Sequence, residues 1–419
     1  MTADASPTLA HHMRRMTGRD PDESERASTP LELLFDLTFV VAVGQAANLF
    51  AHLVAEGHLG SGLIAFTFAT FAVTWAWINF SWFASAFDTD DWVFRVVTMV
   101  QMVGVCIVAL GLPNLFHSID EGGHVDNRIV VIGYVVMRLA MVFNWLRAAR
   151  QAPELRQTCV TYAWAIGIAQ AGWIVVAVVD MALWPTLAAV LVLELIEFLG
   201  PWLAEHRGPA TPWNAEHIAE RYSLFAIIAL GEGVVGTVAA LSSAQDASGG
   251  SIGLDVVLVG AAGIGLTFGM WWTYFLVPSG QVLRGRRYLG FPWGYGNMAL
   301  FGAIIATGAG LHVAALTLEG DAHIGVVGTV LSVAAPVGLY LASVFALHRL
   351  LLGRGDAFHV WLLLVTLAVL GCAVWLAGVG VSMPVCLVVV ALAPVVTVVG
   401  YETGGHRHTG EFLDAIAAE

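Results

Sequence analysis

Ionisable side chains lie in the middle of stretches that are otherwise apolar enough to sit in lipid. Arg138, Glu194 and Glu232 each fall near the midpoint of such a stretch, and Gln45 and Gln101 lie at a similar depth. A charged side chain in hydrocarbon costs between about 2.5 and 17 kcal/mol, depending on the measuring system, so each must face protein, water or a partner. These residues predict a central polar layer in which Arg138 pairs with Glu232, Glu194 or both.

Such a layer suits the chemistry of a proton-coupled carrier. Two ionised glutamates beside one arginine leave a net charge of −1 in a medium of low dielectric constant, which is costly. One glutamate is then protonated or matched by a bound cation, as a proton-coupled site requires. A static buried ion pair that locks two halves of the protein together explains the same residues equally well.

A second group of ionisable residues lies near the cytoplasmic end of three of these stretches. Its members are Glu32, Asp36, Glu197, His217, Glu220 and Arg221. One interpretation is the inner mouth of a substrate or ion path, with Arg221 bridging to Asp36 or Glu32. The alternative for Glu32 and Glu220 is helix capping or ion pairing, because "STPLE" resembles a capping box and acids favour a helix N-terminus. Asp36 is past the first turn, where capping explains less.

The first apolar stretch has polar residues on two faces. Its acids share one face, whereas Gln45, Asn48 and His52 fall on roughly the opposite one at 100° per residue. A break in the helix near Gly44 would turn both sets toward one cavity, as in discontinuous transporter helices. An uninterrupted helix is the alternative, because glycine is frequent in membrane helices.

Other chemistry is disfavoured. His217 with Glu220, and Glu194 with Glu197, have i, i+3 spacing that suits metal ligation, but no paired motif occurs on further helices. Phosphate-binding loops, serine-nucleophile motifs and zinc-protease motifs do not occur in the sequence. The four cysteines are isolated within apolar stretches, as packing residues are. We therefore expect no metal, no cofactor and no soluble-enzyme chemistry.

The elements that position these residues are membrane-spanning helices. The 419 residues are 58% apolar and 12% charged, which excludes an ordinary water-soluble domain. A spanning helix needs about 20 mostly apolar residues. Twelve such stretches are predicted, at 32–54, 61–85, 94–113, 128–148, 158–180, 182–204, 217–241, 252–277, 290–315, 323–348, 357–378 and 382–401.

The arginines predict the orientation of this all-α polytopic protein. The sequence has no lysine, and all arginines except Arg128, Arg138 and Arg221 fall in the tails and loops that are cytoplasmic if both termini are inside. This bias follows the positive-inside rule. The first thirty residues lack the apolar core of a cleavable signal peptide. The net charge of −13 comes largely from the termini and the outer loops, and it excludes a nucleic-acid partner.

Twelve helices divide into two sixes that resemble each other. "TPLELLFDLTFVVAVGQ" and "HIAERYSLFAIIALGEG" occupy matching places, which predicts two parallel six-helix repeats. Aromatic belts that recur at membrane interfaces are the alternative explanation for part of this likeness. The predicted organisation is a disordered cytoplasmic tail at 1–30, a first half at 31–205, a second half at 213–402 and a cytoplasmic C-terminal tail at 403–419.

Three segments resemble the bacterial low-temperature-requirement A family of integral membrane proteins: "TPLELLFDLTFVVAV", "DTDD" and "HIAERYSLFAIIALGEGVVG". The resemblance implies a multi-pass protein of the bacterial inner membrane and carries over no substrate or reaction. The matching motif residues are Glu32, Phe35, Asp36, His217, Glu220, Arg221, Gly231 and Glu232. Leu34 departs from the family pattern, which usually has phenylalanine, and the change is conservative.

The leading expectation is a transporter or channel-like permease for a small solute or ion, with proton coupling as one mode. The alternatives are an intramembrane enzyme that acts on a lipid or isoprenoid, and a structural or sensory membrane protein. The expected partners are membrane lipids and the small solute or ion, and one chain's sequence specifies no oligomeric state.

Overall fold

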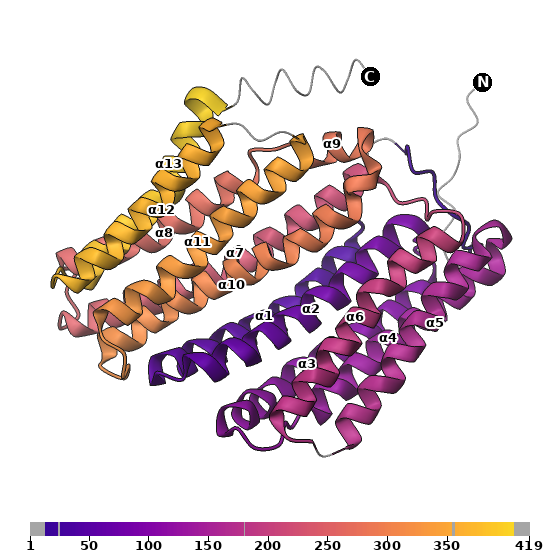
Figure 1. Cartoon of the computed structure of the whole chain (residues 1–419), viewed down its shortest axis with the longest axis horizontal. Helices are drawn as coiled ribbons and strands as arrows, with labels where there is room; N and C mark the ends of the chain where they lie inside the picture. The colour runs from indigo at the N-terminus through magenta and orange to yellow at the C-terminus, as the bar shows by residue number, and fades with distance from the viewer. Residues whose placement is uncertain (1–12, 24–25, 180, 354–356, 406–419) are drawn as a thin grey trace. The chain divides into compact units, whose positions relative to one another are not determined.

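The computed structural model describes residues 13–23, 26–179, 181–353 and 357–405. Within these ranges the only β-pairing is an isolated antiparallel bridge between His124 and Ala182. The α-helices labelled in Figure 1 are α1 Pro30–Glu56, α2 Leu59–Phe87, α3 Trp92–Glu121, α4 Arg128–Gln151, α5 Arg156–Val178, α6 Leu183–Arg207, α7 Ala215–Ala247, α8 Leu254–Tyr274, α9 Ser279–Gly285, α10 Gly290–Glu319, α11 Val326–Leu352, α12 Ala357–Gly378 and α13 Met383–Gly400. Short helical segments also occur at η1 Pro153–Leu155, η2 Arg287–Leu289 and η3 Tyr401–Gly405.

Twelve helical segments of the described chain are long and apolar enough to cross a membrane. This confirms the predicted all-helical, multi-span class. Eight of these helices end two to eight residues beyond the predicted C-terminal ends, because helical hydrogen bonding continues past the last apolar residue, whereas α5, α8 and α13 end one to three residues earlier than predicted. The predicted parallel repeat stays a prediction.

The chain forms two compact units. The first unit comprises Met1–Thr38, Ala76–Gly111 and Gly123–Asn214, and the second comprises Phe39–Trp75, Leu112–Gly122 and Ala215–Glu419. Helices α1, α2 and α3 each contribute to both units, whereas α4 to α6 belong to the first and α7 to α13 to the second.

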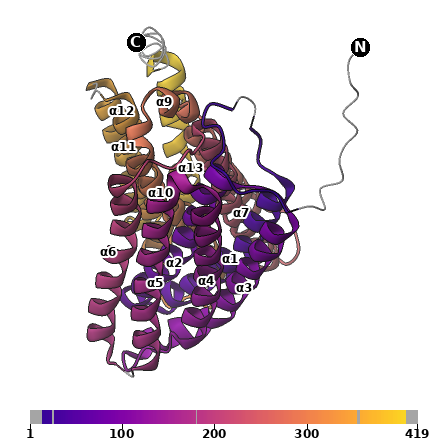
Figure 2. The same cartoon turned by 90° about the vertical axis from the view of Figure 1, so that its right-hand side faces the viewer.

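In the first unit, α5 packs between α4 and α6, as Figure 2 shows. Helix α3 approaches α4 closely at two facing glycines, since a Cβ on Gly104 would lie 2.7 Å from the Gly133 carbonyl oxygen. Small residues at a helix crossing allow the two backbones to touch, which is how membrane helices associate. The buried side chains of α4 therefore face a tightly packed helical core.

In the second unit, α10 packs along both α7 and α11, and α13 packs along α8 and α12 (Figure 1). Helices α7 and α10 approach each other closely at Gly236 and Gly308, where a Cβ on Gly236 would lie 2.5 Å from the Gly308 carbonyl oxygen. This close approach fixes the level at which the side chains of α7 meet those of α10.

The described part of the predicted disordered tail follows a defined path in the first unit. Met16 is fully buried, and its backbone N–H donates a 2.7 Å hydrogen bond to the Gln151 Oε1 atom. Arg15 Nε donates to the Gln151 carbonyl oxygen at 2.9 Å. Residues 13–23 are therefore held on the end of α4. Residues 1–12 of that tail, and 406–419 of the C-terminal tail, lie outside the described ranges.

Candidate functional site

Glu232 lies at the middle of α7 and is buried in the second unit, with 7% of its surface exposed. Two glycines make room for it. A Cβ on Gly44 of α1 would lie 3.1 Å from the Glu232 Oε1 atom, and a Cβ on Gly308 of α10 would lie 2.6 Å from the Glu232 backbone carbonyl carbon. Among the residues that the structure describes, none forms a hydrogen bond or ion pair with this carboxylate. Glu232 is thus a buried acid whose charge no described cation matches.

The predicted break in the first helix does not occur. Helix α1 is continuous from Pro30 to Glu56 through Gly44. Gly44 instead provides the space into which the Glu232 carboxylate projects. The glycine therefore serves close packing and not a change of helix direction.

Arg138 of α4 forms a buried ion pair with Glu197 of α6, inside the first unit. Only 1% of Arg138 is exposed. Glu197 Oε1 also accepts hydrogen bonds from Gln170 Nε2 at 3.2 Å and from the Tyr134 hydroxyl at 3.4 Å. The guanidinium lies over the Tyr134 ring, with 5.5 Å between Cζ and the ring centroid. This Arg138–Glu197 cluster therefore joins side chains of α4, α5 and α6 around the Glu197 carboxylate.

The predicted partners of Arg138 were wrong. We expected Glu194 or Glu232, and placed Glu197 at the cytoplasmic end of its helix. Helix α6 in fact continues to Arg207, so Glu197 lies about 15 Å from the C-terminal end of α6. The Arg138 side chain reaches the Glu197 carboxylate at that depth. Glu194 is half-buried and forms no ion pair with a described residue.

Tyr134 and Gln170 were absent from the predicted site. A usable signal exists for both residues. Tyr134 precedes Arg138 by one helical turn, and Gln170 is an isolated amide within an apolar stretch. A polar side chain in such a stretch needs a partner, so it marks the helix that faces the charge.

The remaining central residues belong to different units. Gln45 is half-buried in the second unit, whereas Gln101 of α3 is fully buried in the first. The shared polar layer that would join them with Arg138 and Glu232 stays a prediction.

Glu32 caps the first turn of α1. Its Oε2 atom accepts a 2.8 Å hydrogen bond from the Thr29 N–H, and the Glu32 N–H donates to Thr29 Oγ1 at 3.3 Å. These reciprocal bonds confirm the capping-box interpretation. Asp36, one turn deeper, accepts a 2.7 Å hydrogen bond from Trp77 Nε1. Both acids therefore have structural partners within the first unit.

The other predicted inner residues lie on the first two turns of α7, in the second unit. His217 and Arg221 are fully buried, and Glu220 is half-buried. Because Glu32, Asp36 and Glu197 belong to the first unit, the common inner cluster stays a prediction.

The "DTDD" loop between α2 and α3 is an ordered acidic turn. Asp88 Oδ1 accepts the Asp90 N–H at 2.7 Å, and Asp90, which has a positive φ of 45°, forms a bidentate pair with Arg95. Asp91 Oδ1 accepts the Phe94 N–H at 2.9 Å and caps α3. Asp91 also forms a buried ion pair with Arg147 of α4. The loop therefore ties three elements of the first unit together.

The pKa values of two acids in this loop are shifted in opposite directions. Burial, reinforced by the charge of Glu32, raises the pKa of Asp88 to about 6. Burial alone would raise the pKa of Asp91 as well, but hydrogen bonds from Arg147 and from backbone N–H groups lower it. Ionised Asp88 therefore destabilises the folded state, whereas ionised Asp91 stabilises it.

Asp88→Asn is expected to stabilise the protein at pH 7 and to change little at pH 4. The folded pKa of about 6 lies above the ordinary 3.8, so wild-type stability falls as pH rises through this interval, by up to about 3 kcal/mol. Asparagine keeps the acceptor for the Asp90 N–H. Unfolding in mixed micelles between pH 4 and 7 measures the difference. Asp91→Asn is the opposite control and should destabilise at pH 7; equal effects of both changes would contradict this assignment.

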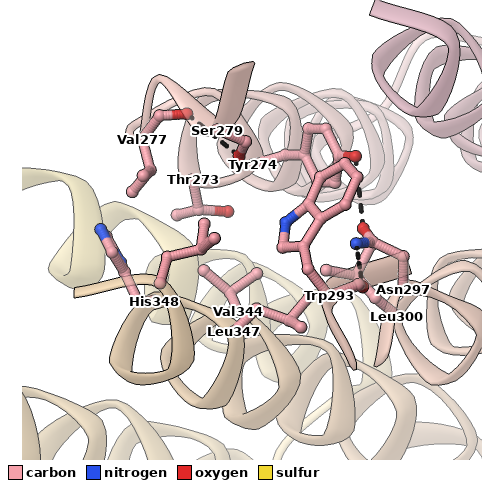
Figure 3. Close-up of a pocket in the computed structure, with 11 residues that line it drawn as sticks. Thr273, Tyr274, Val277, Ser279, Trp293, Asn297, Leu300, Val344, Leu347 and His348 are labelled. Atoms are coloured by element: carbon pink, nitrogen blue, oxygen red, sulfur yellow. Dashed lines mark hydrogen bonds between the residues drawn. The ribbon is translucent and has the colours of Figure 1, made fainter. Parts of the chain in front are cut away.

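A small cavity with a mixed polar and apolar lining lies at the start of α10 in the second unit, and Figure 3 shows its lining. The Tyr274 hydroxyl donates to Asn297 Oδ1 at 3.3 Å, and His348 faces the same space. The cavity volume is about 30 Å³, which is enough for one or two water molecules. Its size suits a bridging water and not a substrate.

The fold and the buried charges define a multi-pass, all-helical membrane protein. The family model of the bacterial low temperature requirement A protein (LtrA) matches residues 27–394, so this chain belongs to the LtrA family. The chain is also similar to the Rhizobium meliloti (strain 1021) protein named "Uncharacterized protein RA0937". The two are 26% identical over 322 residues, which cover 72% of this chain and 73% of the relative.

Proposed function

We propose that this protein is a transporter or channel-like permease for a small solute or ion, coupled to protons, and that Glu232 is its central binding group. One observation carries the proposal: Glu232 is a buried carboxylate at mid-helix in a space made by two glycines, without a described cation partner. An ionisable side chain at that depth is costly, and it marks a substrate, ion or proton pathway more often than a scaffold.

The contrast with Arg138 and Glu197 supports this choice of residue. Glu197 has a cation and two hydrogen-bond donors, so it serves as a fixed structural charge. Glu232 needs a proton or a mobile cation to be neutral, and either can leave. Reversible neutralisation of one buried acid is the elementary step of proton-coupled transport.

Transport fits the cavities better than lipid chemistry does. An apolar groove of about 760 Å³ lies between α1, α2, α10 and α11 and is large enough for an acyl chain. Its described lining has Thr67, Thr70 and Ser332 as polar side chains and no ionisable one. General acid–base catalysis needs a titratable group within hydrogen-bond reach of the substrate. The groove therefore suits a bound lipid tail and not its reaction.

Glu232→Gln is expected to abolish pH-driven flux because glutamine fills the same volume but cannot gain or lose a proton. The measurement uses proteoliposomes that contain a pH-sensitive dye, a panel of small solutes and an imposed pH gradient. Glu216→Gln, at the half-buried start of the same helix, removes an ion pair with Arg284; it is the matched control and should keep wild-type rates. Melting temperatures of both variants establish folding. Wild-type flux in a folded Glu232→Gln protein would refute the role of this carboxylate.

A further inference from the structure

A pocket that four polar and four apolar residues line opens beside the ends of α1 and α10 in the second unit. Its volume is about 200 Å³, which accommodates several water molecules. We call it the histidine pocket, and its lining residues are Asn48, Ala51, His52, Ala239, His312, Ala315, Leu316 and Glu319. The Glu319 carboxylate accepts a 2.6 Å hydrogen bond from the Ser243 hydroxyl.

The pocket lies on the seam that holds Glu232. Helices α1, α7 and α10 run in the same direction there. Glu232 lies beside Gly44 and Gly308 at one level. Further along the three helices, Ser243 donates a hydrogen bond to Glu319, and His52 lines the same pocket as Glu319. Asn48 and His312 each follow their glycine by four residues, which is one turn or about 6 Å.

Polar groups continue along this seam at intervals of about one turn. His52 follows Gly44 by eight residues, or about 12 Å, and Glu319 follows Gly308 by eleven, or about 16 Å. Ala239, which lines the pocket, follows Glu232 by seven residues and therefore shares its face of α7. The pocket thus extends from the helix ends toward the buried carboxylate.

Aromatic rings close the seam on the other side of Glu232. Phe225 precedes Glu232 by seven residues, and its ring centroid lies 4.9 Å from that of Phe301 and 6.4 Å from that of Phe39. All three side chains are fully buried. We call this group the phenylalanine plug. It leaves the histidine pocket as the polar approach to Glu232 along these three helices.

We propose that the histidine pocket is a water-filled vestibule through which protons reach Glu232 from the end where α1 and α10 finish, while the phenylalanine plug blocks the opposite end. The proposal rests on the transport function proposed above. In the predicted orientation the vestibule opens on the outer face.

The side chains of the vestibule suit this task. An imidazole accepts a proton on one ring nitrogen and releases one from the other, so it relays protons without a net change. The ionisable groups that face His312 are His52 from α1 and Glu319 from α10, and the described lining from α7 adds only Ala239. A proton from bulk water passes to an imidazole or an ordered water and then to the Glu232 carboxylate, which becomes neutral.

Cysteine accessibility tests the vestibule without measuring transport. Ala239→Cys faces the pocket. Val238→Cys lies at the same depth but on the apolar side of α7 that faces away from the helix bundle, since 61% of the Val238 surface is exposed. In proteoliposomes, a charged, membrane-impermeant methanethiosulfonate should label Ala239→Cys from one side at least about ten-fold faster, because only a hydrated thiol forms the reactive thiolate. Peptide mass spectrometry reads each position separately, so the native cysteines can stay.

The outcomes of this experiment are distinct. Equal labelling at both positions, or labelling of Ala239→Cys only after detergent is added, overturns the vestibule. Leu316→Cys, which also lines the pocket, repeats the test if Ala239→Cys does not fold. Selective labelling combined with an absence of pH-driven flux in the same vesicles would support the vestibule and refute the transport function.

A paired substitution tests the relay. His52→Asn with His312→Asn should slow proton entry by about a hundred-fold, the lower end of the usual effect of a positioned acid–base group. Labelling of Ala239→Cys in this background should be retained, because asparagine keeps the pocket polar. Unchanged proton entry with labelling retained would overturn the role of the imidazoles.

Discussion

Arg138→Gln is expected to lower the free energy of unfolding by about 3 to 5 kcal/mol, the usual cost of removing one member of a buried ion pair. Glu197 would keep hydrogen bonds from Gln170 and Tyr134, but neither donor carries a charge to balance the carboxylate. The substitution also removes the guanidinium from the Tyr134 ring. Unfolding in mixed micelles at pH 7 measures the loss.

The matched control removes both charges. In Arg138→Met with Glu197→Gln, the glutamine still accepts from Gln170 and Tyr134, and the methionine fills the space of the arginine stem. Replacing a buried ion pair by uncharged residues is often neutral or stabilising, so most of the lost stability should return. A double variant as unstable as Arg138→Gln would show that the pair matters for packing and not for charge balance.

The class of fold could be predicted because it depends on length and composition. A helix must bury or satisfy all of its backbone polar groups in lipid, so twelve apolar stretches give twelve candidate spans. Helix ends were less predictable. Helix α3 continues through Pro113 to Glu121, because proline is tolerated within membrane helices when neighbouring groups satisfy the freed carbonyl.

Single charged residues in the middle of a span were predictable, and their partners were not. The cost of charge in lipid singled out Glu232 and Arg138 from the sequence. Pairing also depends on how far a side chain reaches: Arg138 pairs with Glu197, which lies on α6 one turn from the predicted partner Glu194.

The histidine pocket was only partly visible in the sequence. Asn48 and His52 share one face of the first predicted stretch, but Glu319 lies four residues beyond the end of the predicted stretch at 290–315. Helix α10 in fact ends at Glu319, which places it on the same face as His312, seven residues earlier. The signal that could have found both residues is this i, i+7 spacing at the end of an apolar helix.

Gly308→Ala is expected to destabilise the second unit by about 1 to 3 kcal/mol, the usual cost of overpacking a tight core. The added methyl group would lie 2.6 Å from the Glu232 backbone carbonyl carbon and 2.8 Å from its oxygen. Backbone atoms cannot turn aside as a side chain can, so α7 and α10 must separate. That movement also displaces Glu232 relative to Gly44, and we expect flux to fall together with stability.

Gly302→Ala is the control because it lies on the same helix, where the added methyl group meets only Thr70 Oγ1, at 4.0 Å. Both changes remove the same backbone freedom of glycine, which in helices favours alanine by roughly 0.5 to 1 kcal/mol. The difference between the two variants therefore isolates the clash at the α7–α10 contact. Equal melting temperatures and equal flux in the two variants would show that the helices are not in backbone contact at Gly308, and the space that holds Glu232 would then need another explanation.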